Sequence, residues 1–234
     1  QNENEVVEAL KVSRSVDIGV KYYDSVTQRW EDDDRDKEDK FRTILPTVDA
    51  NLEGGMCRGE LGMFVAPPGV GKSLALANQA VRTLLQNRKV LFLTLEMSTS
   101  RVGKRLDSMI TQIPSARLKT SQLQIHKRLK VFKKKFPESQ IIIKEMPPLA
   151  TNVNHIRVLL NQLKNKEDFQ PDVLIVDYLE LLRPTSGIDA EYQAQQFIAT
   201  ELRGLGQEYG MLVCTATQTN REGRRVNTIT DAEL

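Results

Sequence analysis

Residues 66–73 read APPGVGKS, which is one residue away from the phosphate-binding pattern G-x-x-x-x-G-K-[ST]. In that pattern, the P-loop, successive backbone N–H groups form a nest for anions at the start of a helix. Gly69 and Gly71 hold the positions where the backbone approaches phosphate. Lys72 and Ser73 supply a positive charge and a hydroxyl ligand for Mg²⁺. The alternative is a glycine turn used for packing, but a strand pattern before it and a helix pattern after it favour a nucleotide site.

The departure from the pattern is Ala66, which stands where the first glycine is expected. An alanine adds only a methyl group at the exit of the strand, and it is tolerated there if its φ angle is negative. Pro67 and Pro68 set φ for an extended start of the loop. We therefore predict a negative φ at Ala66 and a working loop. The residues predicted to bind the nucleotide are Pro68, Gly69, Val70, Gly71, Lys72, Ser73 and Leu74.

Short apolar runs alternate with helical patterns from residue 61 to residue 218. The predicted strands cover 61–66, 90–97, 141–146, 173–178 and 211–218. The predicted helices cover 73–86, 99–112, 121–135, 152–165 and 190–209. This alternation indicates an α/β fold with a mostly parallel central sheet flanked by helices. Ligands of such sheets bind outside the carboxyl ends of the strands, so the polar residues there are candidates for chemistry.

Three polar residues stand at these strand ends, each with two interpretations. Asp177 closes the run VLIVD, so it either holds Mg²⁺ or caps a turn. Glu96 ends the strand after the P-loop helix, and a parallel sheet would place it next to the P-loop. It either polarises water for attack on the γ-phosphate, or its negative charge interacts favourably with the N-terminal end of the next helix. Gln218 either senses the γ-phosphate or is a turn residue. Position alone leaves these alternatives open.

Composition narrows the class of protein. The 234 residues carry 33 Lys and Arg against 31 Asp and Glu, so a polyanionic partner must be met by local basic patches. Cys57 and Cys214 lack the spacing of a disulfide framework or a zinc site. No apolar run approaches the roughly 20 residues of a membrane span, and residues 1–20 lack the apolar core of a signal peptide. We therefore expect an intracellular, cytoplasmic protein that does not enter a membrane.

Charged segments suggest the organisation of the chain and its contacts. Residues 31–40, EDDDRDKEDK, are interpreted as a solvated linker, so that 1–40 form an N-terminal arm and 41–234 the main domain. The basic segment 121–135 faces nucleic acid, an acidic neighbour or only solvent, with its apolar stripe packed inward. Two loops at the ligand edge carry the candidate contacts to nucleic-acid phosphates, with a solvated loop as the alternative. These candidates are Arg183, Arg221, Arg224 and Arg225.

The motifs, taken in order, resemble a known family. LEGGMCRGELGMFVAPPGVGKS (52–73), VLFLTLEMS (90–98), VLIVDYLELLRP (173–184) and MLVCTATQTNR (211–221) are similar to the motifs of the DnaB-type hexameric replicative helicases, within the RecA-like P-loop ATPases. The resemblance covers residues 41–228 and is to the phage members in particular. It implies a RecA-like core and a ring-forming helicase that hydrolyses ATP or another NTP with Mg²⁺ and translocates on single-stranded DNA.

Carried over residue by residue, the resemblance assigns roles that position alone leaves open. It implies that Lys72, Glu96 and Gln218 are catalytic, and that Ser73 and Asp177 hold the metal. It also implies a homo-oligomer, a hexamer in this family, with primase and a helicase loader as partners, in the host cytoplasm for a phage protein. The sequence departs from the family pattern in two ways. Ala66 replaces the first glycine of the P-loop, and the chain stops at Leu234, before the position of the family's arginine finger. The second departure predicts a core truncated at its C-terminal end.

Two other classes share these motifs. A RecA-like recombinase or a clock-type ring ATPase would use the same nucleotide site without unwinding DNA. A scaffold subunit that binds nucleotide but depends on a partner would tolerate the loss of Glu96. The form of the assembly, a closed ring around one strand or an open filament, distinguishes a helicase from a recombinase.

Overall fold

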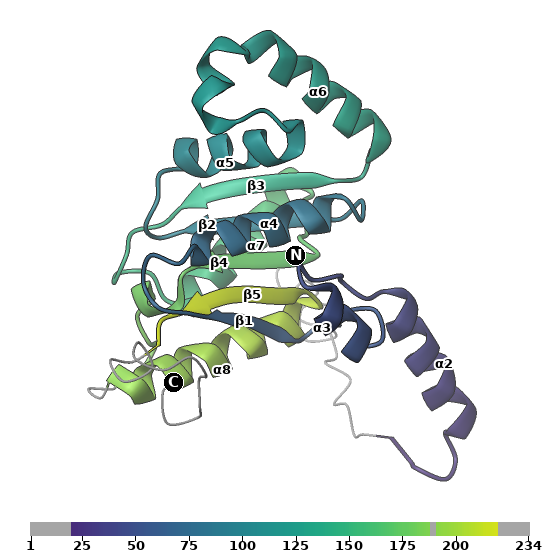
Figure 1. Cartoon of the computed structure of the whole chain (residues 1–234). Helices are drawn as coiled ribbons and strands as arrows, with labels where there is room; N and C mark the ends of the chain where they lie inside the picture. Colours follow the sequence, from purple (N-terminus) through teal and green to yellow (C-terminus); the bar gives the residue numbers. More distant parts are fainter. Residues whose placement is uncertain (1–19, 188–190, 220–234) are drawn as a thin grey trace, which may run out of the picture. The chain divides into compact units, whose positions relative to one another are not determined.

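The computed structural model describes residues 20–187 and 191–219 (Figure 1). The chain divides into two compact units, residues 1–38 and 39–234. Within the first unit, helix α2 spans Val26–Glu38. The predicted solvated linker is therefore helical over most of its length. Its described side chains are exposed as expected up to Lys37, whereas Asp39 and Lys40 are half-buried. Charge pairs at helical spacing, Arg35 with Asp32 and Lys37 with Asp33, support a helix that buries no apolar face.

The second unit is built on a five-stranded sheet in which every pairing is parallel, as predicted (Figure 1). The strands are β1 (Leu61–Val65), β2 (Lys89–Thr94), β3 (Gln140–Glu145), β4 (Val173–Asp177) and β5 (Leu212–Thr217). The helices are α3 (Pro46–Asn51), α4 (Lys72–Leu84), α5 (Thr99–Thr111), α6 (Gln122–Lys135), α7 (Val153–Glu167) and α8 (Glu191–Tyr209), with short 3-10 turns η1 (Ser115–Thr120) and η2 (Leu179–Leu181). The strand order is β1-β5-β4-β2-β3.

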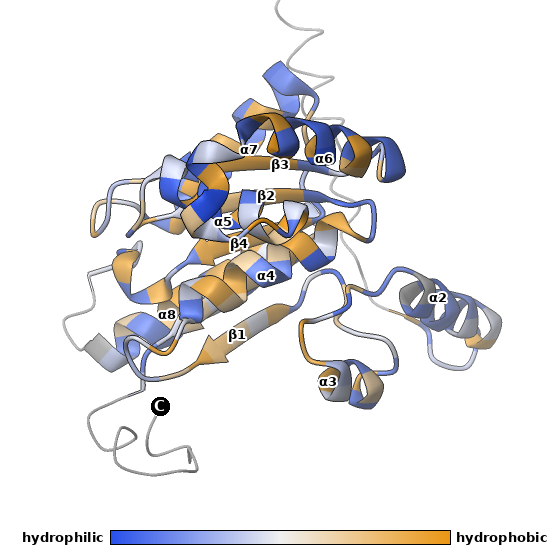
Figure 2. Ribbon diagram, turned by 45° about the horizontal axis from the view of Figure 1, so that its top comes forward, coloured by the Kyte–Doolittle hydropathy of each residue, from blue (hydrophilic) through white to orange (hydrophobic). Residues whose placement is uncertain are grey.

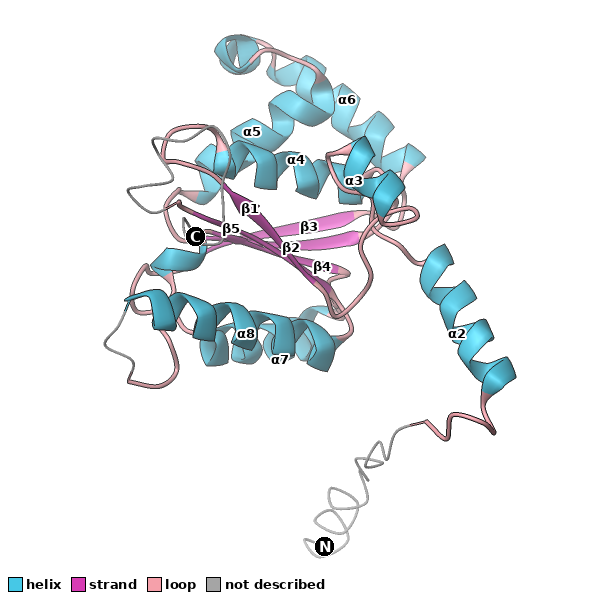
Figure 3. Ribbon diagram, turned by 60° about the horizontal axis from the view of Figure 1, so that its bottom comes forward, coloured by secondary structure: helices cyan, strands magenta, loops and turns pink. Residues whose placement is uncertain are grey.

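The sheet is covered on both faces, with α4 and α5 on one and α7 and α8 on the other (Figure 3). Strand β4 shows how the sequence produces this arrangement. Val173 and Ile175 pack with α4 and α5, whereas Leu174 and Val176 pack with α7 and α8. Successive side chains of a strand point to opposite faces, so a continuous apolar run is what a doubly covered strand requires. The strands are accordingly hydrophobic while the helices are mixed (Figure 2).

Helix α6 confirms the predicted division between an apolar stripe and a basic face. Ile125, Leu129, Phe132 and Phe136 are each half-buried, and the rings of the two phenylalanines lie 4.9 Å apart. Its lysines are exposed. The helix packs on α5, on the side of the sheet that also carries α4 (Figure 3).

The end of one predicted strand needs correction. Strand β2 ends at Thr94 rather than at residue 97, because the chain turns there to begin α5. The strand order places β5 and β4 between β1 and β2, so the strand before Glu96 does not adjoin the P-loop strand. Among the described residues, no helix has the length and apolar character needed to cross a membrane.

Candidate active site

The P-loop joins β1 to α4, and its two glycines have the backbone angles that require glycine. Gly69 has a φ of 80° and Gly71, the N-cap of α4, a φ of 99°. Side-chain-bearing residues are strained in this region. Ala66 is not among the residues with positive φ, which confirms the prediction for that position. The substitution therefore stands where a methyl group causes no backbone strain, and the loop keeps the form of an anion nest.

Lys72 begins α4 and folds back over the loop. Its Nζ atom donates to the carbonyl oxygens of Ala66 and Pro67, at 3.0 and 3.2 Å. The same atom lies 6.0 Å from the centre of the Tyr178 ring. The ammonium group is thus held at the mouth of the nest, where the terminal phosphates of a nucleotide would lie.

Ser73 and Asp177 meet although they are far apart in the sequence. The Ser73 hydroxyl donates to Oδ1 of Asp177 at 2.9 Å. Asp177 is fully buried, and within residues 20–187 and 191–219 its Oδ2 atom has no hydrogen-bond partner. Burial raises the pKa of Asp177, with Glu96 adding to the increase, whereas the Ser73 hydrogen bond and the charges of Arg105 and Lys72 act against it. A buried carboxylate oxygen without a partner is costly unless a cation or donor completes it.

These two side chains fit a magnesium ion. Mg²⁺ prefers oxygen ligands, keeps several waters, and is bound in phosphate-transfer sites by one or two protein groups together with the substrate phosphates. The Ser73 hydroxyl and the buried Asp177 carboxylate provide such a pair beside the anion nest. Among residues 20–187 and 191–219, no group of three or more His, Cys, Asp and Glu side chains is arranged as a metal site. The donors therefore suit a metal that arrives with a nucleotide.

Glu96 is held in the turn after β2. The Thr94 hydroxyl donates to the Met97 carbonyl at 2.7 Å and accepts from the Met97 amide at 3.0 Å, which closes the turn around Glu96. The Leu95 amide donates to the Asp177 carbonyl at 2.9 Å and so ties this turn to the end of β4. Glu96 itself is exposed and lines the same pocket as Lys72. Glu96 and Lys72 therefore line the same pocket even though β1 and β2 are not neighbours in the sheet.

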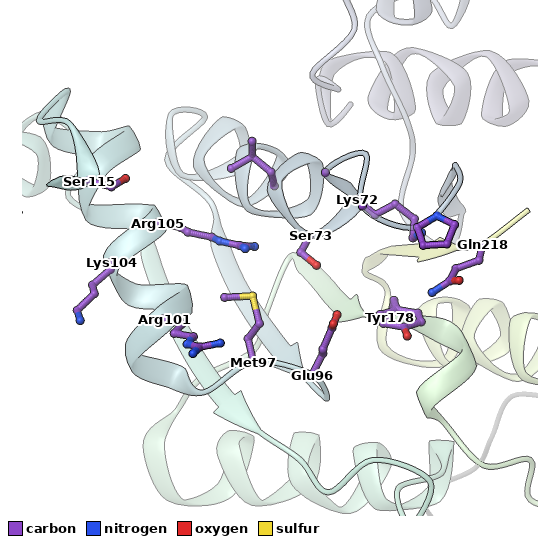
Figure 4. A pocket seen from close by; sticks show the side chains of 14 residues that line it. Lys72, Ser73, Glu96, Met97, Arg101, Lys104, Arg105, Ser115, Tyr178 and Gln218 are labelled. Carbon is purple, nitrogen blue, oxygen red and sulfur yellow. The ribbon is translucent and has the colours of Figure 1, made fainter. Parts of the chain in front are cut away.

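Gln218 follows β5 and lines the pocket from the side of Tyr178 (Figure 4). Its side chain lies beside that of Tyr178, where it acts to lower the Tyr178 pKa. Its backbone amide donates to the Glu180 carboxylate, which also accepts from the Thr217 hydroxyl at 2.6 Å. Burial raises the pKa of Tyr178, and the nearby charges of Glu96 and Glu180 add to it.

The pocket has a volume of about 610 Å³ and is strongly cationic. Figure 4 shows Lys72 and Ser73 on one side, with Arg101, Lys104 and Arg105 of α5 on the other. These α5 cations are spaced by three and four residues, so they share one face of the helix. Neither these cations nor Met97, Ser115 and Tyr178 were predicted from the sequence to line the site. The spacing was a usable signal, because α5 begins at the ligand edge. Such a pocket suits a polyphosphate ligand.

The residues predicted from the sequence lie partly in the pocket and partly outside it. All the candidate nucleotide-binding residues except Val70, which is 63% exposed, line the pocket, as do Glu96 and Gln218. Asp177 lies behind Ser73. Arg183 is exposed after η2, its amide bonded to the Thr151 carbonyl at 2.8 Å, and it does not line the pocket. The remaining candidates for DNA contact, Arg221, Arg224 and Arg225, lie outside the described residues.

Comparison with known proteins agrees with this geometry. The family model of the DnaB-like helicase C-terminal domain matches residues 41–228. The chain is 27% identical over 221 residues to the DnaB-like replicative helicase of enterobacteria phage T4, covering 92% of this chain and 46% of that protein. It is also 27% identical over 180 residues to the replicative DNA helicase DnaB of Rickettsia typhi, covering 71% of this chain and 35% of that protein. The chain thus spans less than half the length of these relatives.

Solved structures show the same fold. An ATPase domain of known structure superimposes with a TM-score of 0.70 at 21% identity, covering 92% of this chain and 78% of that one. A DnaB-like replicative helicase, studied for its interactions with primase, superimposes with a TM-score of 0.67 at 20% identity, covering 90% of this chain and 52% of that one. The parallel sheet and its flanking helices are therefore the RecA-like ATPase arrangement that the sequence predicted.

Proposed function

The chain belongs to the family of DnaB-like helicase C-terminal domains, and from that premise we propose that it is the motor domain of a replicative DNA helicase. The domain binds ATP or another NTP with Mg²⁺, hydrolyses it between subunits of a ring, and translocates on single-stranded DNA. The observation that carries the proposal is the Ser73 to Asp177 hydrogen bond of 2.9 Å beside the glycine nest, because nucleotide hydrolases use this pair to hold the metal.

The side chains around the pocket have separate tasks in this proposal. Lys72 neutralises the terminal phosphates, and the nest of backbone amides at Gly69 and Gly71 binds the chain of phosphates. When bound, Mg²⁺ supplies Lewis-acid charge at the phosphate oxygens. Glu96, exposed into the pocket, accepts the proton of the attacking water. Gln218 contacts the region of the γ-phosphate, and its position beside Tyr178 allows it to respond to the loss of that phosphate.

The assembly and its partners are part of the proposal. The relatives are named replicative helicases, so we propose a homo-oligomeric ring, a hexamer, that encloses single-stranded DNA. The DNA is contacted by Arg183 and by Arg221, Arg224 and Arg225. A primase is a proposed partner, because one structural neighbour was studied for its interactions with primase, and a helicase loader is another. The proposed location is the cytoplasm, that of the host if the protein is encoded by a phage.

Hydrolysis tests the nucleotide site. In the full-length protein, Lys72→Ala should abolish NTP hydrolysis stimulated by single-stranded DNA, whereas Lys89→Ala, at the start of β2 and so at the end of the strand away from the pocket, should leave it unchanged. Glu96→Gln should bind nucleotide but turn over about 100-fold more slowly. The control for that variant is Glu138→Gln, on an exposed loop away from the pocket. Wild-type turnover by Lys72→Ala would exclude this site as the nucleotide site.

Electron micrographs with nucleotide and single-stranded DNA test the assembly. A closed six-membered ring supports a helicase, and strand separation on a forked duplex then completes the assignment. An open filament that pairs homologous DNA would favour a RecA-like recombinase. A ring that hydrolyses NTP but leaves the fork intact would favour a clock-type ATPase.

A further inference from the structure

The ends of β4 and β5 separate beside the pocket, and one side chain bridges them. Backbone pairing of the two strands stops at Val176 and Thr215. Beyond that point, Glu180 of η2 accepts hydrogen bonds at its Oε1 atom from the Thr217 hydroxyl and the Gln218 amide. A carboxylate has therefore replaced the backbone carbonyl that a continuing ladder would have supplied.

The bridge holds the residue that faces the pocket. Thr217 is fixed on its other side too, because its carbonyl accepts from the Ala66 amide at 3.3 Å, at the entrance of the P-loop. The backbone at Thr217 and Gln218 is thus held on one side by the P-loop strand and on the other by the segment that follows Asp177. From there its side chain reaches Tyr178 and lines the pocket (Figure 4).

The hydrogen bonds of this bridge are incomplete. The second oxygen of Glu180, Oε2, is buried and has no hydrogen-bond partner among the described residues, and the same holds for the hydroxyl of Thr219, a residue only 3% exposed. A buried polar network that serves stability alone has its members satisfied, since each unpaired atom is costly. One unpaired acceptor and one unpaired donor at the same strand end mark a site that can exchange partners.

We propose that Glu180 is a positioning residue of the proposed hydrolase site: its carboxylate fixes the end of β5 so that the Gln218 side chain faces the nucleotide. This inference rests on the proposed function. Glu180 does not line the pocket, so it acts through Gln218 rather than on the substrate. Removing it should affect turnover and not nucleotide affinity, because Lys72 and Ser73 remain in place.

Substitutions at Glu180 separate positioning from binding. Glu180→Ala in the full-length protein should lower kcat for DNA-stimulated hydrolysis about ten-fold or more, because small displacements of a reacting constellation cost this much. The dissociation constant of a fluorescent nucleotide analogue should stay within about two-fold of the wild-type value. Glu180→Gln should keep near wild-type turnover, because the amide oxygen can accept both hydrogen bonds. Wild-type kcat for Glu180→Ala overturns the inference.

A double variant shows whether Glu180 acts through Gln218. If it does, Glu180→Ala combined with Gln218→Ala should be no slower than Gln218→Ala alone. Losses that multiply would mean that the two residues act independently, and would overturn the inference. A structural defect alone would not produce the non-additive result.

A matched pair of threonines covers the case in which Glu180→Ala does not fold. Thr217→Val removes one donor to Glu180 and should slow hydrolysis. Thr215→Val removes a similar buried hydrogen bond, to the Val176 carbonyl at 2.9 Å, one step back along the strand, and should not slow it. Equal rates for the pair overturn the inference. Lys72→Ala in the same assay separates the two hypotheses: if it is inactive while Glu180→Ala is unaffected, the proposed function survives and only this inference fails.

Discussion

The hydroxyl of Ser73 donates to Oδ1 of Asp177 at 2.9 Å and so joins the first turn of α4 to the end of β4. The carboxyl group that receives this bond is fully buried, and its second oxygen has no partner in the part of the chain that the structure describes. The protein therefore holds a carboxyl group in a place where burial disfavours its charged form. A group of this kind lowers the stability of the fold and is retained where function requires it.

Neutralising this carboxylate should stabilise the protein at neutral pH. Burial raises the pKa of Asp177 above its ordinary value, so its contribution to stability is fully present below the pKa of the unfolded chain and is lost as the pH rises through the folded value. Asp177→Asn avoids that loss and should raise the free energy of unfolding by about 1 kcal/mol at pH 7. Urea denaturation in metal-free buffer measures the difference.

The pH dependence provides the control. The advantage of Asp177→Asn should disappear below about pH 3, where the wild-type carboxyl group is protonated in both the folded and the unfolded state. The variant should in addition lose NTP hydrolysis and any stabilisation by nucleotide with Mg²⁺. A variant less stable than wild type at pH 7 would show that the carboxylate is not a destabilising group.

The backbone of the P-loop predicts opposite outcomes for two exchanges of glycine and alanine. Gly71→Ala places a side chain at a φ of 99° and should lower stability by about 1 kcal/mol and weaken nucleotide binding. Ala66→Gly restores the common pattern, but Ala66 does not have a positive φ, so it should leave nucleotide affinity unchanged. Thermal denaturation and nucleotide titration test both. Tighter binding by Ala66→Gly would mean that the alanine does restrict the loop.

The sequence predicted the sheet and the P-loop because these depend on local pattern. The run VLIVD indicated a strand covered on both faces, and the extended start of the loop indicated the negative φ of Ala66. Strand order was not predictable, because it depends on which faces pack together; Glu96 lines the P-loop pocket as expected, but from a strand that is not next to β1. The bridge from Glu180 to Gln218 was missed for the same reason, since its partners are 38 residues apart.

The helix α2 was missed for a different reason. The acidic run was weighed by its charge, which argues against burial, and not by its capacity for pairs at helical spacing. Asp32 with Arg35 and Asp33 with Lys37 supply such pairs. A segment can therefore be solvated, as predicted, and still be helical.

At the start of the second unit, Arg58 holds two carboxylates together. Its Nε atom lies 2.5 Å from Oδ2 of Asp39, and its Nη2 atom 2.6 Å from Oδ1 of Asp172. A third donor, Nη1, bonds to the Gly210 carbonyl at 2.8 Å, and the guanidinium lies 5.2 Å from the centre of the buried Phe41 ring. Burial acts to raise the pKa of Asp39, but the hydrogen bonds and charges of Arg58 and Arg88 outweigh it, so the pKa is lowered.

Removing Arg58 should therefore destabilise the second unit in a manner that depends on pH. Arg58→Met keeps most of the apolar stem and should lower the free energy of unfolding by about 1 to 2 kcal/mol at pH 7, allowing for partial exposure of the network. The matched control is Arg157→Met, which breaks a single pair with Glu208 on the surface and should cost less than about 1 kcal/mol.

Because the pKa of Asp39 is lowered, the stability that Arg58 provides is present above the unfolded pKa and is lost as the pH falls through the folded one. The difference between wild type and Arg58→Met in urea denaturation should accordingly shrink below about pH 4. Equal losses for the two variants, or a difference that does not change with pH, would show that the network contributes no more than an ordinary surface pair.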